Sequence, residues 1–100
     1  MAVNLRQEAR GRECQIRVPG VCNHNPETTV LCHIHVPSLS GGMGKKSHDV
    51  FASYGCSACH DFVDGRTGNA TIFSRRQYLY EGCFRTQKIL MGEGKIGIRD

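Results

Sequence analysis

The chain has no tryptophan, only three prolines in 100 residues, and no long apolar run. None of its segments approaches the roughly 20 apolar residues that a transmembrane helix requires. The first ten residues, MAVNLRQEAR, lack the apolar stretch of a secretory signal peptide. Without repeats or long linkers, residues 1–100 are expected to form one domain. These absences argue against a membrane protein and predict a protein of the reducing cytosol.

Apolar side chains are also scarce, at 39% of the chain, whereas glycine is frequent, with 12 residues. A loop-rich domain of this size gains from a staple because its core is modest. Six cysteines and five histidines can supply a metal-binding one. In a reducing compartment, cysteines are more often metal ligands than disulfide partners. We therefore expect a metal ion to hold this fold together.

Negative charge is in short supply, because nine acidic residues face 13 basic ones, for a net charge of +4. The basic residues gather in clusters such as Lys45–Lys46 and Arg75–Arg76. Such a surface attracts the phosphates of a polyanion. Charge by itself is equally compatible with a soluble basic surface, so it favours a nucleic-acid partner without requiring one.

Two segments of the first half have the pattern of β-strands. Residues 13–18 alternate polar and apolar side chains, as a half-buried strand does, and Pro19 and Gly20 follow as a strong turn signal. Residues 28–36 are rich in β-branched side chains. Val21 and Cys22 would return the chain after that turn and complete a small β-hairpin, with residues 28–36 as a further strand segment. Residues 1–12 are predicted to form a short basic lead-in of helical character.

The second half is predicted to be mainly helical, over residues 49–54, 58–66 and 74–90. Ser57 and Ser74 stand where helix N-caps belong, and Gly82 weakens the longest helix because glycine is unfavourable in a helix interior. The inward face of that helix is predicted to carry Leu79, Cys83 and Phe84. The fold class is thus α+β, a β-hairpin with a helix and a C-terminal helix, and residues 92–100 form a tail.

Four cysteines form two pairs. Cys56 and Cys59 are a CxxC motif, and Cys14 and Cys22 form a wider pair across the predicted hairpin. The separation of Cys14 and Cys22 is even, so both thiols would face one side of a regular strand and the turn would bring them together. Two such pairs supply the four thiolates of a closed tetrahedral zinc site.

Cys32 and Cys83 lack a paired spacing and are interpreted as buried thiols. The run from Cys56 to His60 also matches CxxCH, the attachment motif of c-type haem. A haem protein would need an export signal and a sixth axial ligand, and it would leave Cys14 and Cys22 without a role. Structural zinc is therefore the preferred interpretation.

His60 is expected in the first turn of a helix, with Asp64 four residues later. Positions i and i+4 share a helix face, so this imidazole and carboxylate can hold one divalent cation beside the zinc site. The alternative is that the acidic residues near the start of this helix simply favour its dipole.

His33 and His35 share a face of the predicted strand, by its period of two. A neutral imidazole at this place can take a proton from water, since histidine titrates near physiological pH. The alternative is a structural or surface histidine. His48 and Asp49 precede the CxxC motif, where either can support a strand histidine or bind metal.

Taken in order, these motifs resemble the HNH nucleases, also called ββα-metal or His-Me finger nucleases. The resemblance rests on the cysteine pair near the start, the run TVLCH that ends at His33, a glycine-rich loop, the His48–Asp49 pair and the run CSACHD from Cys56. It covers residues 4–91. Within this class, the chain resembles a group of short phage- and prophage-encoded proteins, which open with a run like residues 11–15.

The resemblance implies a β-hairpin packed on a helix with a metal ion between them. His33 matches the general base of the family, and His60 and Asp64 match helix ligands of a catalytic divalent cation such as Mg²⁺. The asparagine of the family name has no counterpart, and Asp49 occupies its neighbourhood. Cys32 stands where many members place a His or Asp ligand, and a thiolate suits Mg²⁺ poorly. These two departures concern catalysis and not the fold.

The function expected is that of a metal-dependent endonuclease that hydrolyses phosphodiester bonds of DNA in a bacterial cytosol. His33, Asp49 and His60 are its expected catalytic residues. Phosphate contacts, which position a strand without reading its sequence, are assigned to Lys45, Lys46, Arg66, Arg75 and Arg76. The alternative is a non-catalytic zinc module that binds DNA or a recombination partner and needs no second metal.

Overall fold

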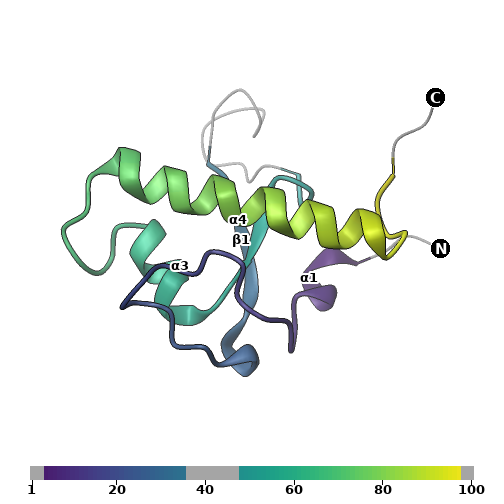
Figure 1. The fold of residues 1–100 in the computed structure, drawn as a ribbon, viewed down its shortest axis with the longest axis horizontal. Helices are drawn as coiled ribbons and strands as arrows, with labels where there is room; N and C mark the ends of the chain where they lie inside the picture. Colours follow the sequence, from purple (N-terminus) through teal and green to yellow (C-terminus); the bar gives the residue numbers. More distant parts are fainter. Residues whose placement is uncertain (1–3, 36–47, 98–100) are drawn as a thin grey trace.

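The computed structural model describes residues 4–35 and 48–97, which form an α+β domain with one two-stranded antiparallel sheet. In Figure 1 the longest helix lies across the sheet, and the two shorter α-helices lie on either side of it. In chain order the elements are α1 (Leu5–Glu8), the 3-10 helix η1 (Pro26–Thr28), β1 (Val30–His33), β2 (Ala52–Gly55), α3 (Ser57–Val63) and α4 (Ile72–Gly92).

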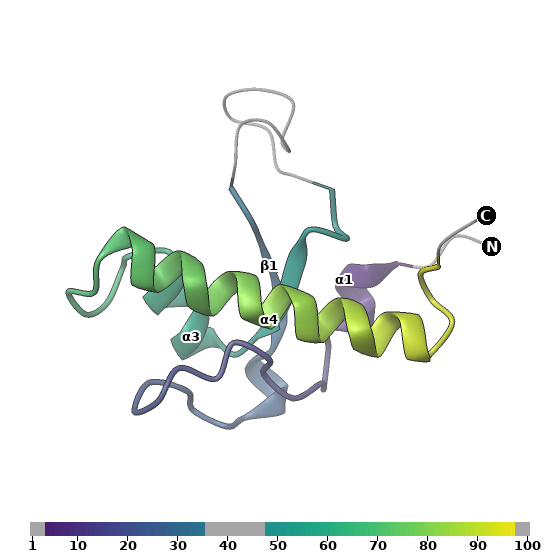
Figure 2. The same cartoon turned by 45° about the horizontal axis from the view of Figure 1, so that its top comes forward.

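The strand predicted over 28–36 is present in its central part as β1, and it pairs with a strand that the sequence did not predict. β1 pairs with β2, Leu31 opposite Tyr54 and His33 opposite Ala52, and Figure 2 shows the two strands behind α4. The prediction of helical turns over 49–54 is therefore wrong, because residues 49–51 form a turn and residues 52–54 belong to β2. The backbone N–H of Tyr54 donates to Thr86 Oγ1 (3.0 Å), so β2 is held by α4 as well as by β1.

The prediction of a strand over 13–18 is also wrong. These residues are irregular, because the backbone N–H groups of Ile16 and Arg17 donate to the sulfur of Cys14 and are lost to a strand ladder. One strand-like contact remains, from the Gln15 N–H to the Tyr54 carbonyl (2.8 Å). The predicted turn at Pro19–Gly20 is present, with two hydrogen bonds returning to the Val18 carbonyl.

Both predicted long helices are present, but each begins at a different cap. The thiol of Cys56, and not Ser57, caps α3 by accepting the Cys59 N–H (3.4 Å). Thr71 caps α4 through its hydroxyl, which accepts the N–H of Ser74, the residue predicted as the cap (3.2 Å). The cap of α3 therefore lies one residue, and the cap of α4 three residues, earlier than expected.

The inward face of α4 is a stripe at helical spacing that includes the predicted Leu79 and Cys83, with Thr86 and Leu90 continuing it. Phe84 lies outside that stripe and is 67% exposed, so the prediction that it points inward is wrong. Gly82 is buried where α4 meets the sheet, and a Cβ there would lie 3.1 Å from the Ile16 Cα. The helix thus tolerates this glycine because the backbones approach closely.

The two faces of the sheet belong to different clusters, because side chains alternate along a strand. Leu31 and Tyr54 pack with Leu5 of α1 and Leu90 of α4. Cys32 points to the other face, into a larger cluster that contains the cysteine pairs, Val63 of α3 and Leu79 of α4. The sheet is therefore held between α1 on one face and α3 on the other, and α4 contributes side chains to both clusters.

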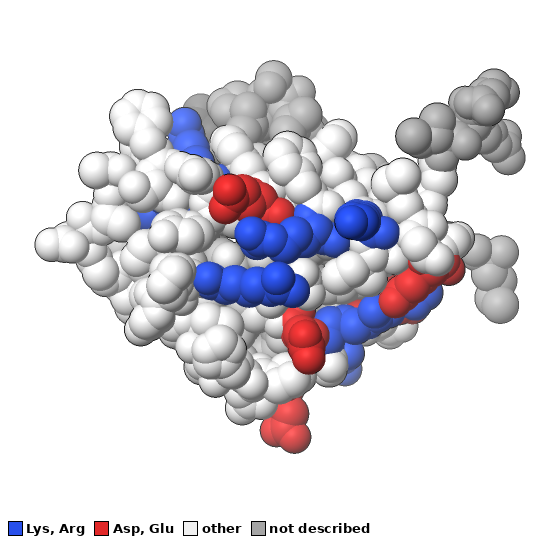
Figure 3. Space-filling view, viewed as in Figure 1, with Lys and Arg blue, Asp and Glu red and all other residues white. Residues whose placement is uncertain are grey.

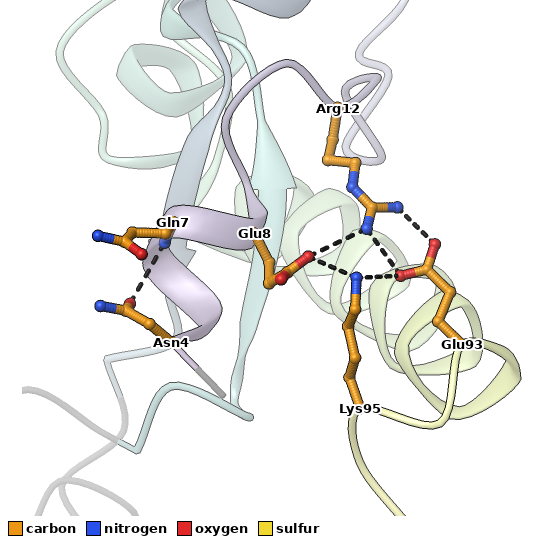
Figure 4. Close-up of polar contacts among 6 residues, drawn as sticks. All are labelled: Asn4, Gln7, Glu8, Arg12, Glu93 and Lys95. Atoms are coloured by element: carbon orange, nitrogen blue, oxygen red, sulfur yellow. Dashed lines mark hydrogen bonds and ion pairs between the residues drawn. The ribbon is translucent and has the colours of Figure 1, made fainter. Parts of the chain in front are cut away.

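Ion pairs join the two ends of the described chain (Figure 4). Arg12 contacts both carboxylate oxygens of Glu93 (2.6 and 2.7 Å), and Lys95 bridges Glu8 (2.5 Å) and Glu93 (3.0 Å). The Arg12 guanidinium, with help from Lys95, lowers the pKa of Glu93 to about 2. These side chains are partly exposed, so their contribution is modest and sensitive to salt.

Among residues 4–35 and 48–97, none of the helices is both long and apolar enough to cross a lipid bilayer.

Candidate metal centre and catalytic residues

The structure brings Cys14, Cys22, Cys56 and Cys59 together, with their sulfur atoms all within 4.8 Å of one another. The Cys22 and Cys56 sulfurs are 3.9 Å apart. Around a tetrahedral zinc with Zn–S bonds of about 2.3 Å, neighbouring sulfurs lie about 3.8 Å apart, whereas a disulfide would need about 2.05 Å. These four cysteines, called the cage below, therefore have a spacing that fits a metal ion such as zinc. Their thiols are not disulfide-bonded.

The backbone turns tightly in the two loops that contain Cys14 and Cys22. Arg17 and His24 have φ angles of 57° and 55°, an uncommon backbone conformation outside glycine. Backbone N–H groups near Cys14 and at His24 donate to the Cys14 and Cys22 sulfurs. Such N–H···S hydrogen bonds favour the thiolate. These hydrogen bonds to sulfur explain the backbone conformation of Arg17 and His24. Nothing in the sequence indicated that conformation.

The closely spaced thiols of the cage favour binding of a cation. A hydrogen bond from the Cys59 thiol holds the pKa of Cys14 well below its usual range, and the pKa of Cys59 is correspondingly raised. Burial is the main cause of the raised pKa of Cys22. Four thiolates at this spacing would repel one another strongly unless a dication neutralised them.

The two remaining cysteines are buried outside the cage. Burial raises the pKa of Cys83 to about 11, and it raises the pKa of Cys32 further still. A nearby carboxylate, Asp64, adds to the effect on Cys32. Both side chains therefore stay protonated thiols at neutral pH, as apolar core residues do.

His33 forms a close pair with Asp49. The His33 Nε2 and Asp49 Oδ1 atoms are 2.7 Å apart, and the Nε of Arg6 lies 3.5 Å from the same oxygen. The hydrogen bond from His33, followed by the charge of Arg6, lowers the pKa of Asp49. Because Nε2 is occupied by the carboxylate, Nδ1 is the ring nitrogen that can accept a proton.

His60 and Asp64 form a second pair, on one face of α3. Their Nε2 and Oδ2 atoms are 3.1 Å apart. Neighbouring ligand atoms in an octahedral shell of about 2.1 Å radius are about 3.0 Å apart, so this spacing suits two ligands of one Mg²⁺-like cation. Arg66 contacts the same Asp64 oxygen (3.6 Å) and Asp61 (3.2 Å).

Three of the five predicted phosphate-binding residues lie together. Arg66, Arg75 and Arg76 line one hollow with Asp64. Lys45 and Lys46 lie outside the described residues. In Figure 3, Lys and Arg side chains gather over the middle of α4, with acidic side chains among them. A phosphate in the hollow would therefore meet a locally positive surface.

His33 and Asp64 line different hollows. His33 belongs to one that also has Arg6 and Arg10 of the N-terminal segment on its wall, whereas Asp64 shares its hollow with His35. The two imidazole–carboxylate pairs thus approach β1 from opposite faces. The sequence indicated each pair but not this separation, which depends on how α1 and α3 pack on the strand.

The structure gives roles to three residues that sequence reasoning had left without one. His35 lines the same hollow as Asp64, Arg6 supports Asp49, and the His24 ring nitrogen is 3.8 Å from the Cys22 sulfur. The two-residue spacing had predicted that His35 shares a face with His33, but the two histidines line different hollows. His48, by contrast, accepts the backbone N–H of Val50 (3.2 Å), so its Nδ1 caps a turn.

The fold and the site define a small α+β domain with a cluster of four cysteines that can hold a metal ion, and with two imidazole–carboxylate pairs. The chain belongs to the family described as "Putative nuclease YbcO", whose model matches residues 3–95. It is 50% identical over 93 residues to proteins of that name from Escherichia coli K12 and from Enterobacteria phage 82, covering 93% of this chain and 96% of each relative.

A solved structure supports the same fold. It is described as "Structure of a putative bacteriophage protein from Escherichia coli", and it matches with a TM-score of 0.75 and 47% identity. The match covers 91% of this chain and all of the other. The chain is therefore a member of a phage- and prophage-associated family named for nuclease activity.

Proposed function

We propose that this protein is a metal-dependent endonuclease of the HNH type that hydrolyses phosphodiester bonds of DNA. The observation that carries the proposal is the two imidazole–carboxylate pairs, His33 with Asp49 at 2.7 Å and His60 with Asp64 at 3.1 Å. One pair has the composition of a general base with its supporting carboxylate, and the other that of a cation site. The family name and the arginine-lined hollow support a nucleic-acid substrate.

In this mechanism, His33 Nδ1 takes a proton from water while Asp49 holds the ring through Nε2. The resulting hydroxide attacks the phosphorus in line and displaces the bridging oxygen. Mg²⁺ or a similar cation, when bound by His60 and Asp64, supplies stabilisation of the charge on the phosphate and on the leaving oxygen. Arg66, with the other basic residues of its hollow and with Lys45 and Lys46, binds flanking phosphates.

The position of β1 is central to this proposal. The outer edge of β2 is covered by Gln15 and Thr86, whereas β2 is the one strand that pairs with β1 within the described residues. A phosphodiester that lies across the free edge of β1 would meet His33 from one face and the Asp64 side from the other. Zinc bound in the cage would hold the two sides of β1 in a fixed relative position, because Cys59 directly precedes His60.

The direct test is plasmid cleavage in Mg²⁺ or Mn²⁺ by His33→Ala beside His35→Ala, its neighbour in the Asp64 hollow. We expect His33→Ala to lower the rate by about 10²-fold or more, the usual worth of a general base, with zinc content and melting temperature unchanged. His35→Ala should retain most activity. Cleavage by His33→Ala at the wild-type rate would show that the base is wrongly assigned.

A second candidate function is a non-catalytic zinc module that binds DNA. The separate hollows of His33 and Asp64 favour it, as does a buried thiol at Cys32, where a hard cation would want oxygen or nitrogen. If the purified protein binds DNA with zinc in place but cuts no plasmid or branched DNA with any divalent cation, this second function is the correct one.

A further inference from the structure

Helix α4 has a second face that residues 4–35 and 48–97 leave uncovered. Phe73 is 78% exposed and Phe84 is 67% exposed, and a shallow groove lies between them. Large exposed aromatic side chains in one patch mark a binding surface more often than chance exposure does. The groove is lined by Phe73, Arg76, Gln77, Tyr80, Glu81 and Phe84.

This groove adjoins the hollow that contains Asp64. Arg76 and Tyr80 line both. No carboxylate of the described residues forms an ion pair with Arg76, whereas Glu81, the acidic residue of the groove, lies 3.9 Å from Arg85. The unneutralised charge of the groove is therefore positive, and it stands at the junction with the hollow that contains Asp64.

We propose that the groove on α4 binds unpaired nucleotides of a DNA strand, with bases stacked on Phe73 and Phe84. Arg76 contacts the intervening backbone where the strand passes toward the Asp64 hollow. The two phenylalanines are 11 residues apart, roughly 16 Å along the helix axis. The proposal deepens the proposed function, on which it rests for the direction of the strand, by naming single-stranded or branched DNA as the substrate class.

The chemistry of the groove distinguishes unpaired from paired DNA. In a duplex the faces of the bases are covered by their neighbours, so exposed aromatic rings find nothing to stack on. An unpaired strand offers base faces, and stacking on aromatic side chains is the usual way to bind them. A groove with one unneutralised arginine between two phenylalanines suits the unpaired strand better than a row of duplex phosphates.

The test measures binding of a labelled 12-nucleotide oligothymidylate and of a 12-base-pair duplex by fluorescence anisotropy, without added divalent cation. The double variant Phe73→Leu/Phe84→Leu keeps apolar area but loses the rings, whereas Phe73→Tyr/Phe84→Tyr keeps them. We expect the leucine variant to bind the single strand about tenfold or more weakly, and the tyrosine variant within about twofold of wild type. Duplex affinity should change by less than about twofold in both.

A matched control is Met91→Ala, an exposed apolar residue on α4 that does not line the groove, which should leave both affinities unchanged. Equal single-strand affinity in the leucine and wild-type proteins would overturn the proposal, as would an equal loss for duplex. A wild-type dimer that the leucine variant converts to monomer in sedimentation would show that a second copy covers the groove. Because no cleavage is measured, this binding result can be interpreted even if the nuclease proposal fails. Likewise, a failure of this proposal leaves the cleavage test unaffected.

Discussion

At the scale of single residues, the pair of His33 and Asp49 carries the proposed chemistry. The pKa of Asp49 is lowered first by its hydrogen bond from His33 and then by Arg6, so the group stays a carboxylate across the neutral range. A carboxylate on Nε2 fixes the tautomer that leaves Nδ1 free to accept a proton. In the proposed mechanism, Asp49 is therefore a positioning residue that acts through His33.

Replacement of Asp49 by asparagine tests this role. We expect Asp49→Asn to lower kcat by about 10²-fold or more with little change in KM, because the ring loses its fixed tautomer. Since the folded-state pKa of Asp49 is depressed, its stabilising contribution is present above about pH 4 and is lost as the pH falls through the folded value. The wild-type protein should thus keep this contribution throughout a neutral cleavage assay.

Arg6→Gln is the matched control, since it removes the more distant of the two contacts to Asp49 (3.5 Å, against 2.7 Å for His33). It should lower kcat much less than Asp49→Asn does. An Asp49→Asn protein with wild-type kcat, or with a raised KM alone, would mean that Asp49 contacts substrate or is structural and does not position the base.

At the scale of elements, sequence patterns predicted the features that depend on interactions between residues close together in the chain. The CxxC spacing and the i,i+4 spacing of His60 and Asp64 were readable because one helix sets both. Residues 52–55 were not, since this short strand depends on a partner about 20 residues away in the chain. Residues 13–18 alternate like a strand, but the Cys14 sulfur takes the N–H groups that a ladder would need.

Gly82 shows the same conflict within α4, where local preference and tertiary packing disagree. Helix propensity alone favours alanine over glycine by about 1 kcal/mol. A Cβ at Gly82 would lie 3.1 Å from the Ile16 Cα, a backbone atom that cannot move aside easily. We expect Gly82→Ala to destabilise the protein by a net 1–3 kcal/mol or so, the usual cost of overpacking, measured by urea unfolding.

Gly92→Ala provides the comparison, since no atom lies within 4 Å of the added Cβ at this end of the same helix. Its urea midpoint should match the wild-type value or exceed it. A Gly82→Ala protein that gains stability as Gly92→Ala does would contradict the close approach of α4 to the Cys14–Val18 segment.

At the scale of the whole molecule, the four-cysteine cage joins parts of the chain that lie far apart in the sequence. It links the N-terminal loops of Cys14 and Cys22 to the start of α3, and hence to His60. Binding of structural zinc is worth about 10–16 kcal/mol in small domains, comparable to or larger than the whole stability of a typical fold. The cage is therefore expected to decide whether the domain folds at all.

Metal stoichiometry tests this arrangement most directly, measured by elemental analysis after dialysis and by Mn²⁺ titration. We expect one retained zinc per chain in the wild-type protein and in Cys83→Ser, whose buried thiol is outside the cage, and none in Cys56→Ser, which should unfold. We also expect one exchangeable Mn²⁺ that Asp64→Asn abolishes. A wild-type protein that folds without zinc, or an Asp64→Asn protein that binds Mn²⁺ as before, would contradict the two-metal centre.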